Sequence, residues 1–176
     1  LQQKFSLPPS TVAVRFMRLR PQNFPSIRLV QLAQLYTSSQ QLFAKIFEGK
    51  TFHVQWMTRV GVSSFWKTHY TFEKAAKPRD KKITPAFVDL LKVNTLIPLY
   101  FCYHKFKGKD PTAKVFDFML EIKPENNAIV AGYQALGAKA NNALDTQSFL
   151  QLKKEYCALK KCLLCSVGVH LLNHPD

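Results

Sequence analysis

The sequence predicts a mainly α-helical protein, a single bundle of about six or seven helices behind a proline-rich, coil-like N-terminal segment. Two observations favour this class: apolar residues recur at three-and-four spacing over most of the chain, and prolines or turn residues separate the periodic stretches. A length of 176 residues with 47% hydrophobic positions fits one core. We therefore expect residues 1–25 to form an extended leader and residues 26–176 to form the helical domain.

The first helices are expected directly after the leader, whose prolines disfavour helix but allow a short strand over residues 12–17. Ser26 is a candidate N-cap for a helix that ends near residue 37. Its apolar stripe would consist of Leu29, Leu32, Ala33 and Tyr36. A second short helix follows and ends at Gly49. Residues 51–72 fit neither the helical nor the strand period, although their aromatic content indicates burial.

The middle of the chain carries clear helix signals. Residues 74–82 alternate in charge around a proline and are predicted to be an exposed loop. Thr84 as N-cap and Pro85 at the first helical position begin the next helix. Pro98 removes a hydrogen bond inside that helix, which must kink or restart there.

Three more helices are expected after a turn at residues 105–110. Two of them cover residues 112–123 and 126–136, and Gly137 closes the second. The last begins at Asp145 or Thr146 and runs to Gly168. Its packing seam would consist of Phe149, Leu152, Tyr156, Leu159 and Leu163.

Charge is both large and uneven. The chain has 25 Lys and Arg against 11 Asp and Glu, a formal net charge of +14. Residues 1–47 contain six basic and no acidic residues, and a second basic block covers residues 67–109. Such a surface attracts polyanions, of which nucleic acid is the commonest in cells, although lysines can also simply solvate a surface. No run approaches about 18 uncharged apolar residues, so we expect no membrane contact.

Four arginines near the N-terminus are the candidate phosphate contacts: Arg15, Arg18, Arg20 and Arg28. Two prolines between Arg20 and Arg28 stiffen the backbone and would hold the two guanidinium groups at a fixed separation. Guanidinium forks bind phosphate, but they bind helix carbonyls or an internal acid equally well. We expect a basic binding module for nucleic acid, with the internal alternative left open.

Three cysteines close to the C-terminus are the second candidate site: Cys157, Cys162 and Cys165. On one continuous helix they would lie on the side opposite the packing seam. With Cys102 as a fourth ligand, their spacing matches one type of iron–sulfur site, and zinc with His170, His174 or Cys102 is the other metal alternative. The third alternative is that they are inert buried thiols in a structural domain. This cysteine distribution favours a reducing cytoplasm.

No catalytic motif is present. There is no H-E-x-x-H string, nucleophile elbow or glycine-rich phosphate loop, so the sequence leaves open whether the protein is an enzyme. His69 and His104 are the residues that an enzyme would use.

Several strings carry a resemblance to one family. They are Arg20-Pro-Gln-Asn-Phe-Pro-Ser-Ile-Arg28, Phe65-Trp-Lys-Thr-His-Tyr70, Val93-Asn-Thr-Leu-Ile-Pro98, Lys123-Pro-Glu-Asn126, residues 148–152 and Tyr156-Cys-Ala-Leu-Lys-Lys-Cys-Leu-Leu-Cys165. In this order they resemble the uncharacterised bacterial "domain of unknown function 2851" family, found chiefly in Bacteroidota. The resemblance implies the C-terminal half of a longer cytoplasmic protein, with the N-terminal half as its partner, and it implies no activity. The chain departs from the family at Cys102-Tyr103-His104, where Ala-Tyr-Gly is more usual, so a metal role for Cys102 is not implied.

Overall fold

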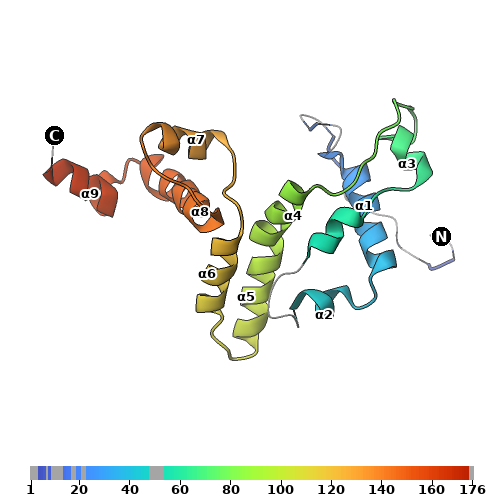
Figure 1. The fold of residues 1–176 in the computed structure, drawn as a ribbon, viewed down its shortest axis with the longest axis horizontal. Helices are drawn as coiled ribbons and strands as arrows, with labels where there is room; N and C mark the ends of the chain where they lie inside the picture. Colours follow the sequence, from blue (N-terminus) through green and yellow to red (C-terminus); the bar gives the residue numbers. More distant parts are fainter. Residues whose placement is uncertain are drawn as a thin grey trace. The chain divides into compact units, whose positions relative to one another are not determined.

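A computed structural model describes residues 4–6, 8, 14–16, 19–20, 23–47 and 54–174, apart from the Lys45 side chain. Over these residues the protein is mainly helical, as predicted (Figure 1). Two compact units are formed: the first comprises residues 1–49 and 53–88, and the second comprises residues 50–52 and 89–176. This division does not coincide with the boundary expected at residue 25. Of the strand allowed at residues 12–17, residues 14–16 are described and are not in a strand, and the other three positions lie outside the described residues, as does Gly49.

The first unit consists of short helices around a small apolar core. Its elements are α1 (Pro25–Ser38), α2 (Leu42–Phe47), the 3₁₀ helix η2 (Gln55–Arg59), α3 (Ser64–Thr68) and the start of α4 (Pro85–Leu91). Fully buried apolar residues come from four of its segments: Ile27, Val54, Ile83 and Val88. The segment that the sequence left unassigned, residues 51–72, thus supplies η2 and α3.

Helix α1 buries a face different from the predicted one. The helix begins at Pro25 behind Phe24, not with a Ser26 cap, because the Ser26 hydroxyl donates to the Tyr70 carbonyl oxygen instead. Its buried residues are Ile27, Gln31 and Leu35, while the predicted stripe of Leu29, Leu32 and Tyr36 is exposed. Apolar spacing therefore identified the helix correctly but assigned its inner face wrongly.

The predicted interruption at Pro98 is present as a change of helix type. Thr84 caps α4 through its hydroxyl, which accepts from the Phe87 N–H at 3.2 Å. A π-helical turn, η3 (Lys92–Leu96), then precedes α5 (Ile97–Phe106), and the Ile97 N–H donates to the Lys92 carbonyl. The wider turn places Pro98 at the second position of α5, where its missing N–H costs least.

The combined helical segment is also the one described stretch that is long and apolar enough to cross a membrane, judged by length and composition. It is 22 residues long and its mean hydropathy is 1.2. Asp89 and Lys92 form an ion pair at 3.1 Å in its first half, and Leu96 and Ile97 are buried within the protein.

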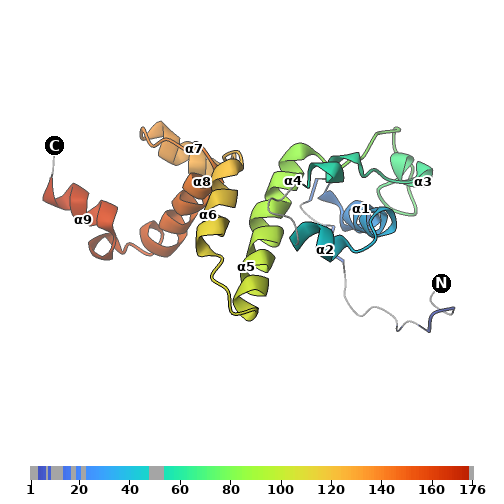
Figure 2. The same cartoon turned by 60° about the horizontal axis from the view of Figure 1, so that its bottom comes forward.

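The second unit continues from α5 with three further helices. They are α6 (Thr112–Glu121), α7 (Ala128–Ala135) and α8 (Ala143–Gln151). Helix α6 packs on α5, α8 on α6 and α7 on α8, and Figures 1 and 2 show α6 beside α5 and α8 beside α6. The core comprises Ile97, Phe118, Met119, Ile122 and Ala143. Gly137 closes α7 in the left-handed region, at φ 89°, as predicted.

The last predicted helix is not continuous. Helix α8 begins behind Asn142, whose side chain accepts from the Asp145 N–H, and passes into a π-helical turn, η4 (Leu152–Cys157). The chain then turns at residues 158–161 before a short 3₁₀ turn, η5 (Cys162–Leu164), and α9 (Ser166–Asn173). Gly168 lies inside α9, where a Cβ would collide with the Cys162 carbonyl oxygen. Glycine there permits close approach of the two backbone segments and does not end the helix.

Candidate functional site

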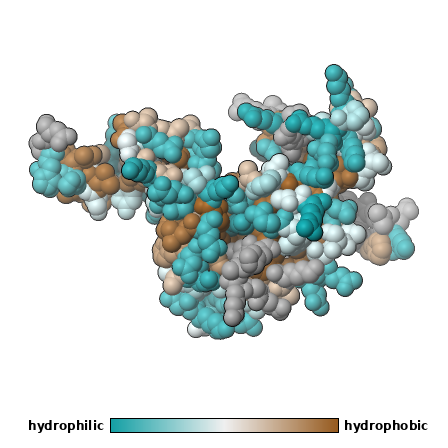
Figure 3. Space-filling view, viewed as in Figure 1, coloured by the Kyte–Doolittle hydropathy of each residue, from teal (hydrophilic) through white to brown (hydrophobic). Residues whose placement is uncertain are grey.

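The first unit carries most of the charge. It contains 13 Lys and Arg against three Asp and Glu, a formal net charge of +10 out of the total of +14. Six of these basic residues lie between Lys67 and Lys82, where only Glu73 and Asp80 are acidic. We call residues 67–82 the basic segment. Figure 3 shows hydrophilic residues gathered over α3 and the chain that follows it.

Backbone hydrogen bonds hold the basic segment against α3. A single antiparallel bridge joins His69 and Ala75 and closes a turn at residues 70–74. The returning chain then donates from the Ala76 N–H to the Thr68 carbonyl at 2.6 Å and from the Arg79 N–H to the Lys67 carbonyl at 3.0 Å. These bonds satisfy helix-terminal carbonyls that would otherwise lack partners.

Lys81 is the buried anchor of the basic segment. Its side chain is 6% exposed, and its ammonium donates to the Trp66 carbonyl at 2.5 Å and to the His69 carbonyl at 2.7 Å. The same ammonium lies 3.6 Å from the centre of the Tyr70 ring. Burial lowers the pKa of Lys81. The sequence placed this lysine in an exposed loop, and its burial could not be read from local charge.

The remaining basic side chains of this region are exposed. Lys82 pairs with Asp80 at 3.0 Å. In the part of the chain that the structure describes, no acidic partner is found for four exposed cations: Arg59, Lys67, Lys74 and Lys77. With Lys81 fixed inside, the basic segment presents Lys67, Lys74 and Lys77 to solvent, and η2 presents Arg59.

An aromatic cluster accompanies the cations. The Phe65 and His69 rings stack with centres 4.0 Å apart, and Trp66 contacts Phe72 edge-on at 5.1 Å. Phe72 lies in the turn of the basic segment and is 80% exposed. An aromatic ring in solvent between lysines is available for stacking.

The predicted arginine contacts have different environments. Arg15 and Arg20 are exposed, and Arg18 lies outside the described residues. The Arg28 guanidinium donates to the side-chain oxygens of Asn23 at 2.6 Å and Gln31 at 2.8 Å, and it lies 3.5 Å from the Phe87 ring centre. Burial lowers the pKa of Arg28. Its partners are amide oxygens, not the helix carbonyls or internal acid that the sequence left as the alternative.

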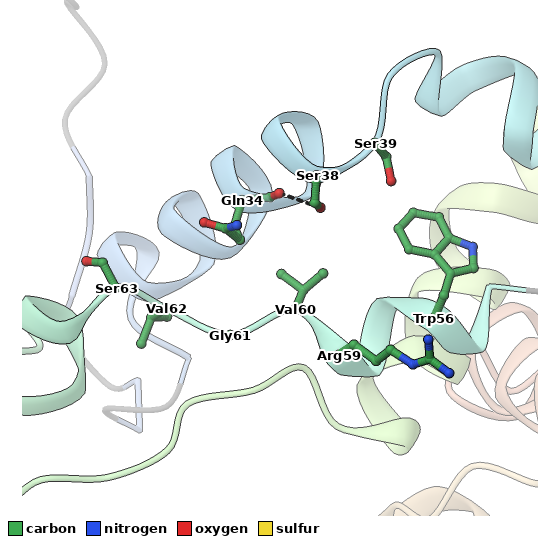
Figure 4. A pocket seen from close by; sticks show the side chains of 9 residues that line it. All are labelled: Gln34, Ser38, Ser39, Trp56, Arg59, Val60, Gly61, Val62 and Ser63. Carbon is green, nitrogen blue, oxygen red and sulfur yellow. Dashed lines mark hydrogen bonds between the residues drawn. The ribbon is translucent and has the colours of Figure 1, made fainter.

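A cavity of about 390 Å³ opens between the end of α1 and η2, and we call it the Trp56 cavity. It is lined by Gln34, Ser38, Ser39, Trp56, Arg59 and residues 60–63. Figure 4 draws the Trp56 indole between Ser39 and the Arg59 guanidinium. The sequence analysis did not identify this site. Its one local signal is an aromatic residue and a cationic residue three positions apart in a short helix, Trp56 and Arg59.

The three late cysteines line a second cavity, also of about 390 Å³, together with Tyr133 and apolar side chains. Cys157 contacts the Tyr133 hydroxyl at 3.4 Å, and burial together with this contact raises the pKa of Tyr133 to about 12. Cys165 is buried, whereas Cys157, Cys162 and Cys102 are exposed. Among the described residues, no three His, Cys, Asp or Glu side chains are placed to hold a metal ion. The expected zinc or iron–sulfur site therefore has no support from this geometry.

The two histidines considered for catalysis are packed against aromatic rings. His69 stacks on Phe65, and its Nδ1 lies 3.0 Å from the Phe65 carbonyl oxygen. The His104 ring lies 4.2 Å from the Tyr100 ring centre, and its Nε2 is buried without a hydrogen-bond partner in the described part of the chain. Neither ring faces a cavity described above.

Comparison with known protein families matches residues 1–128 to the family described as "Protein of unknown function (DUF2851)". The chain belongs to this family. The DUF2851 match covers the whole first unit and continues into the second, and it ends before the three late cysteines. No curated protein and no solved structure matches the chain.

Proposed function

We propose that the first unit of this DUF2851 protein binds nucleic acid through its phosphates. The observation that carries the proposal is the concentration of charge there, 13 basic against three acidic residues. Nucleic acid is the commonest polyanion in cells, and releasing the counterions of its phosphate backbone drives association with such a surface.

The geometry of the basic segment supports the proposal. Lys67, Lys74 and Lys77 are exposed, and no carboxylate within the described residues neutralises them. Phe72 adds an exposed ring beside them. Cations that follow the backbone, combined with aromatic rings that stack on bases, are the usual equipment of proteins that bind single strands.

The predicted leader contacts take different roles in this proposal. Arg15, Arg18 and Arg20 would extend the phosphate-binding surface. Arg28 would act indirectly, because its guanidinium already binds Asn23 and Gln31 and orders the turn before α1.

The test measures the affinity for a labelled oligonucleotide over a series of salt concentrations. Replacing Lys74 and Lys77 together by Gln should reduce the slope of log K against log salt by about 0.7–0.9 for each phosphate that the variant no longer neutralises. The matched control replaces Lys139 and Lys153 by Gln, which removes the same charge from exposed positions of the second unit. This control should leave the slope unchanged. Absence of binding at low ionic strength, or equal effects of the two double variants, contradicts the proposal.

A further inference from the structure

The Trp56 cavity has walls of three chemical kinds. One is a flat aromatic face, the half-buried indole of Trp56. A second is a set of neutral polar groups, the Gln34 amide and the hydroxyls of Ser38, Ser39 and Ser63. The third is a single cation, Arg59. No acidic residue lines the cavity.

The polar groups of the cavity retain hydrogen-bonding capacity. The Ser38 hydroxyl donates to the Gln34 carbonyl at 2.7 Å, which leaves its oxygen free to accept (Figure 4). Within the described residues, neither the Gln34 side-chain amide nor the Arg59 guanidinium has a hydrogen-bond or ion-pair partner. An amide offers both a donor and an acceptor, which suits the mixed donor and acceptor edge of a nucleobase.

The size and position of the cavity also fit a small planar group. A volume of about 390 Å³ lies within the range of small-molecule sites, which combine apolar or aromatic walls with a few polar groups. Arg59 lies one helical turn from Trp56 in η2, so a group stacked on the indole would have a cation beside it. A nucleobase linked to a phosphate is complementary to this arrangement, because its flat ring can stack on the indole while its negative charge pairs with the cation.

We propose that the Trp56 cavity holds one unpaired nucleobase of a single-stranded nucleic acid, stacked on Trp56, while Arg59 binds an adjacent phosphate. This inference rests on the proposed function and specifies its ligand as a single strand. A duplex offers no free base face, so the duplex would engage the phosphate contacts alone.

The experiment compares two ligands that differ only in their bases. One is a short oligodeoxythymidine, and the other is an abasic strand of equal length with the same phosphates. Stacking of one base on an aromatic side chain corresponds to about a 5- to 150-fold preference for the strand that carries bases. The preference should persist in Trp56→Phe, which keeps a flat ring, and in Trp56→Leu, which keeps apolar bulk, it should fall to the part that Phe72 contributes. Arg59→Gln should weaken the binding of both strands alike.

Fluorescence gives an independent readout. The chain has two tryptophans, so Trp66→Phe leaves Trp56 as the sole indole reporter. Thymidine strands should quench its emission, whereas abasic strands should not. Equal affinity for both strands, or a preference unchanged in Trp56→Leu, overturns the base site while leaving phosphate binding intact. Failure of both strands to bind at low salt overturns the proposed function itself.

Discussion

Replacing Lys81 by Met should destabilise the first unit far more than the same change at its neighbour Lys82. Lys81 is 6% exposed and its ammonium donates to two carbonyls, those of Trp66 and His69. Lys82 is exposed and pairs only with Asp80 at the surface. Both substitutions remove one positive charge and leave an unbranched apolar chain, so they differ mainly in burial.

The magnitude follows from the two carbonyl acceptors. Leaving a fully buried acceptor without its donor costs about 1–3 kcal/mol, and because the Trp66 and His69 carbonyls are only partly buried, the two together give about 2–4 kcal/mol. Part of this is offset, because Met carries no buried charge, whereas burial desolvates the Lys81 ammonium and lowers its pKa. We expect a net loss of about 1–3 kcal/mol of unfolding free energy for Lys81→Met. The exposed pair of Lys82 contributes roughly 0–1 kcal/mol.

Urea unfolding followed by tryptophan fluorescence measures the difference, since both tryptophans belong to the first unit. The free energies of the two variants are compared with that of the unsubstituted protein. If the Lys81 variant loses no more stability than the Lys82 variant, then Lys81 does not anchor the basic segment.

Two further predictions concern an acid transition and a surface ring. The Lys105 and Thr112 side chains hydrogen-bond to Asp110 and lower its pKa to about 2. A carboxyl with a lowered folded pKa stabilises the fold above its usual pKa of 3.8 and loses this contribution as the pH falls towards 2, so Asp110→Asn should weaken the pH dependence of helix content in that window. Circular dichroism between pH 5 and pH 2 measures it, and an identical acid transition in both proteins contradicts the assignment. Phe72→Ala should weaken oligonucleotide binding about fivefold or more with little change in the salt slope, because the ring contributes stacking and no charge. Phe106→Ala is the control, since Phe106 is 85% exposed in the second unit, and an equal loss of affinity in both variants removes Phe72 from the interface.

Local signals in the sequence predicted several helix boundaries, although the Ser26 cap and the helix end at Gly168 are wrong. The Thr84 cap, the interruption at Pro98 and the closure of α7 at Gly137 are all confirmed. Each depends on groups that lie within a few residues of one another. These are a hydroxyl that accepts from a nearby N–H, a proline that lacks an N–H, and a glycine with a left-handed φ. Such interactions are encoded locally and can be read from a single sequence.

The inner face of α1 depends instead on partners far along the chain. Gln31 is 3% exposed, yet both ends of its amide are satisfied: it accepts from Arg28 and donates to the Lys81 carbonyl at 2.9 Å. A buried amide is tolerated when its hydrogen bonds are complete. Because one partner lies 50 residues away, apolar spacing alone placed Leu32 in the buried stripe and gave no sign that Gln31 is buried.

The prediction of one continuous last helix is wrong for a related reason. Apolar residues do recur there at helical spacing, but Lys160 adopts a left-handed φ of 54° and the chain turns before Cys162. Leu159 and Leu163, two members of the predicted seam, are therefore exposed. The face assignment of the three cysteines depended on one continuous helix, so the argument that set their sulfurs opposite the seam no longer applies.

The occupied guanidinium of Arg28 changes which residues a nucleic-acid interface depends on. A fork that already binds Asn23 and Gln31 and covers the Phe87 ring would have to give up these contacts to reach a phosphate. Arg59 and Lys74 face no such competition within the described residues. Removing Arg28 should therefore reduce stability before it reduces the salt slope, whereas removing Lys74 and Lys77 should reduce the slope alone. Comparing the loss of stability with the loss of salt slope in each variant therefore distinguishes Arg28, which would order the interface, from Lys74 and Lys77, which would form it.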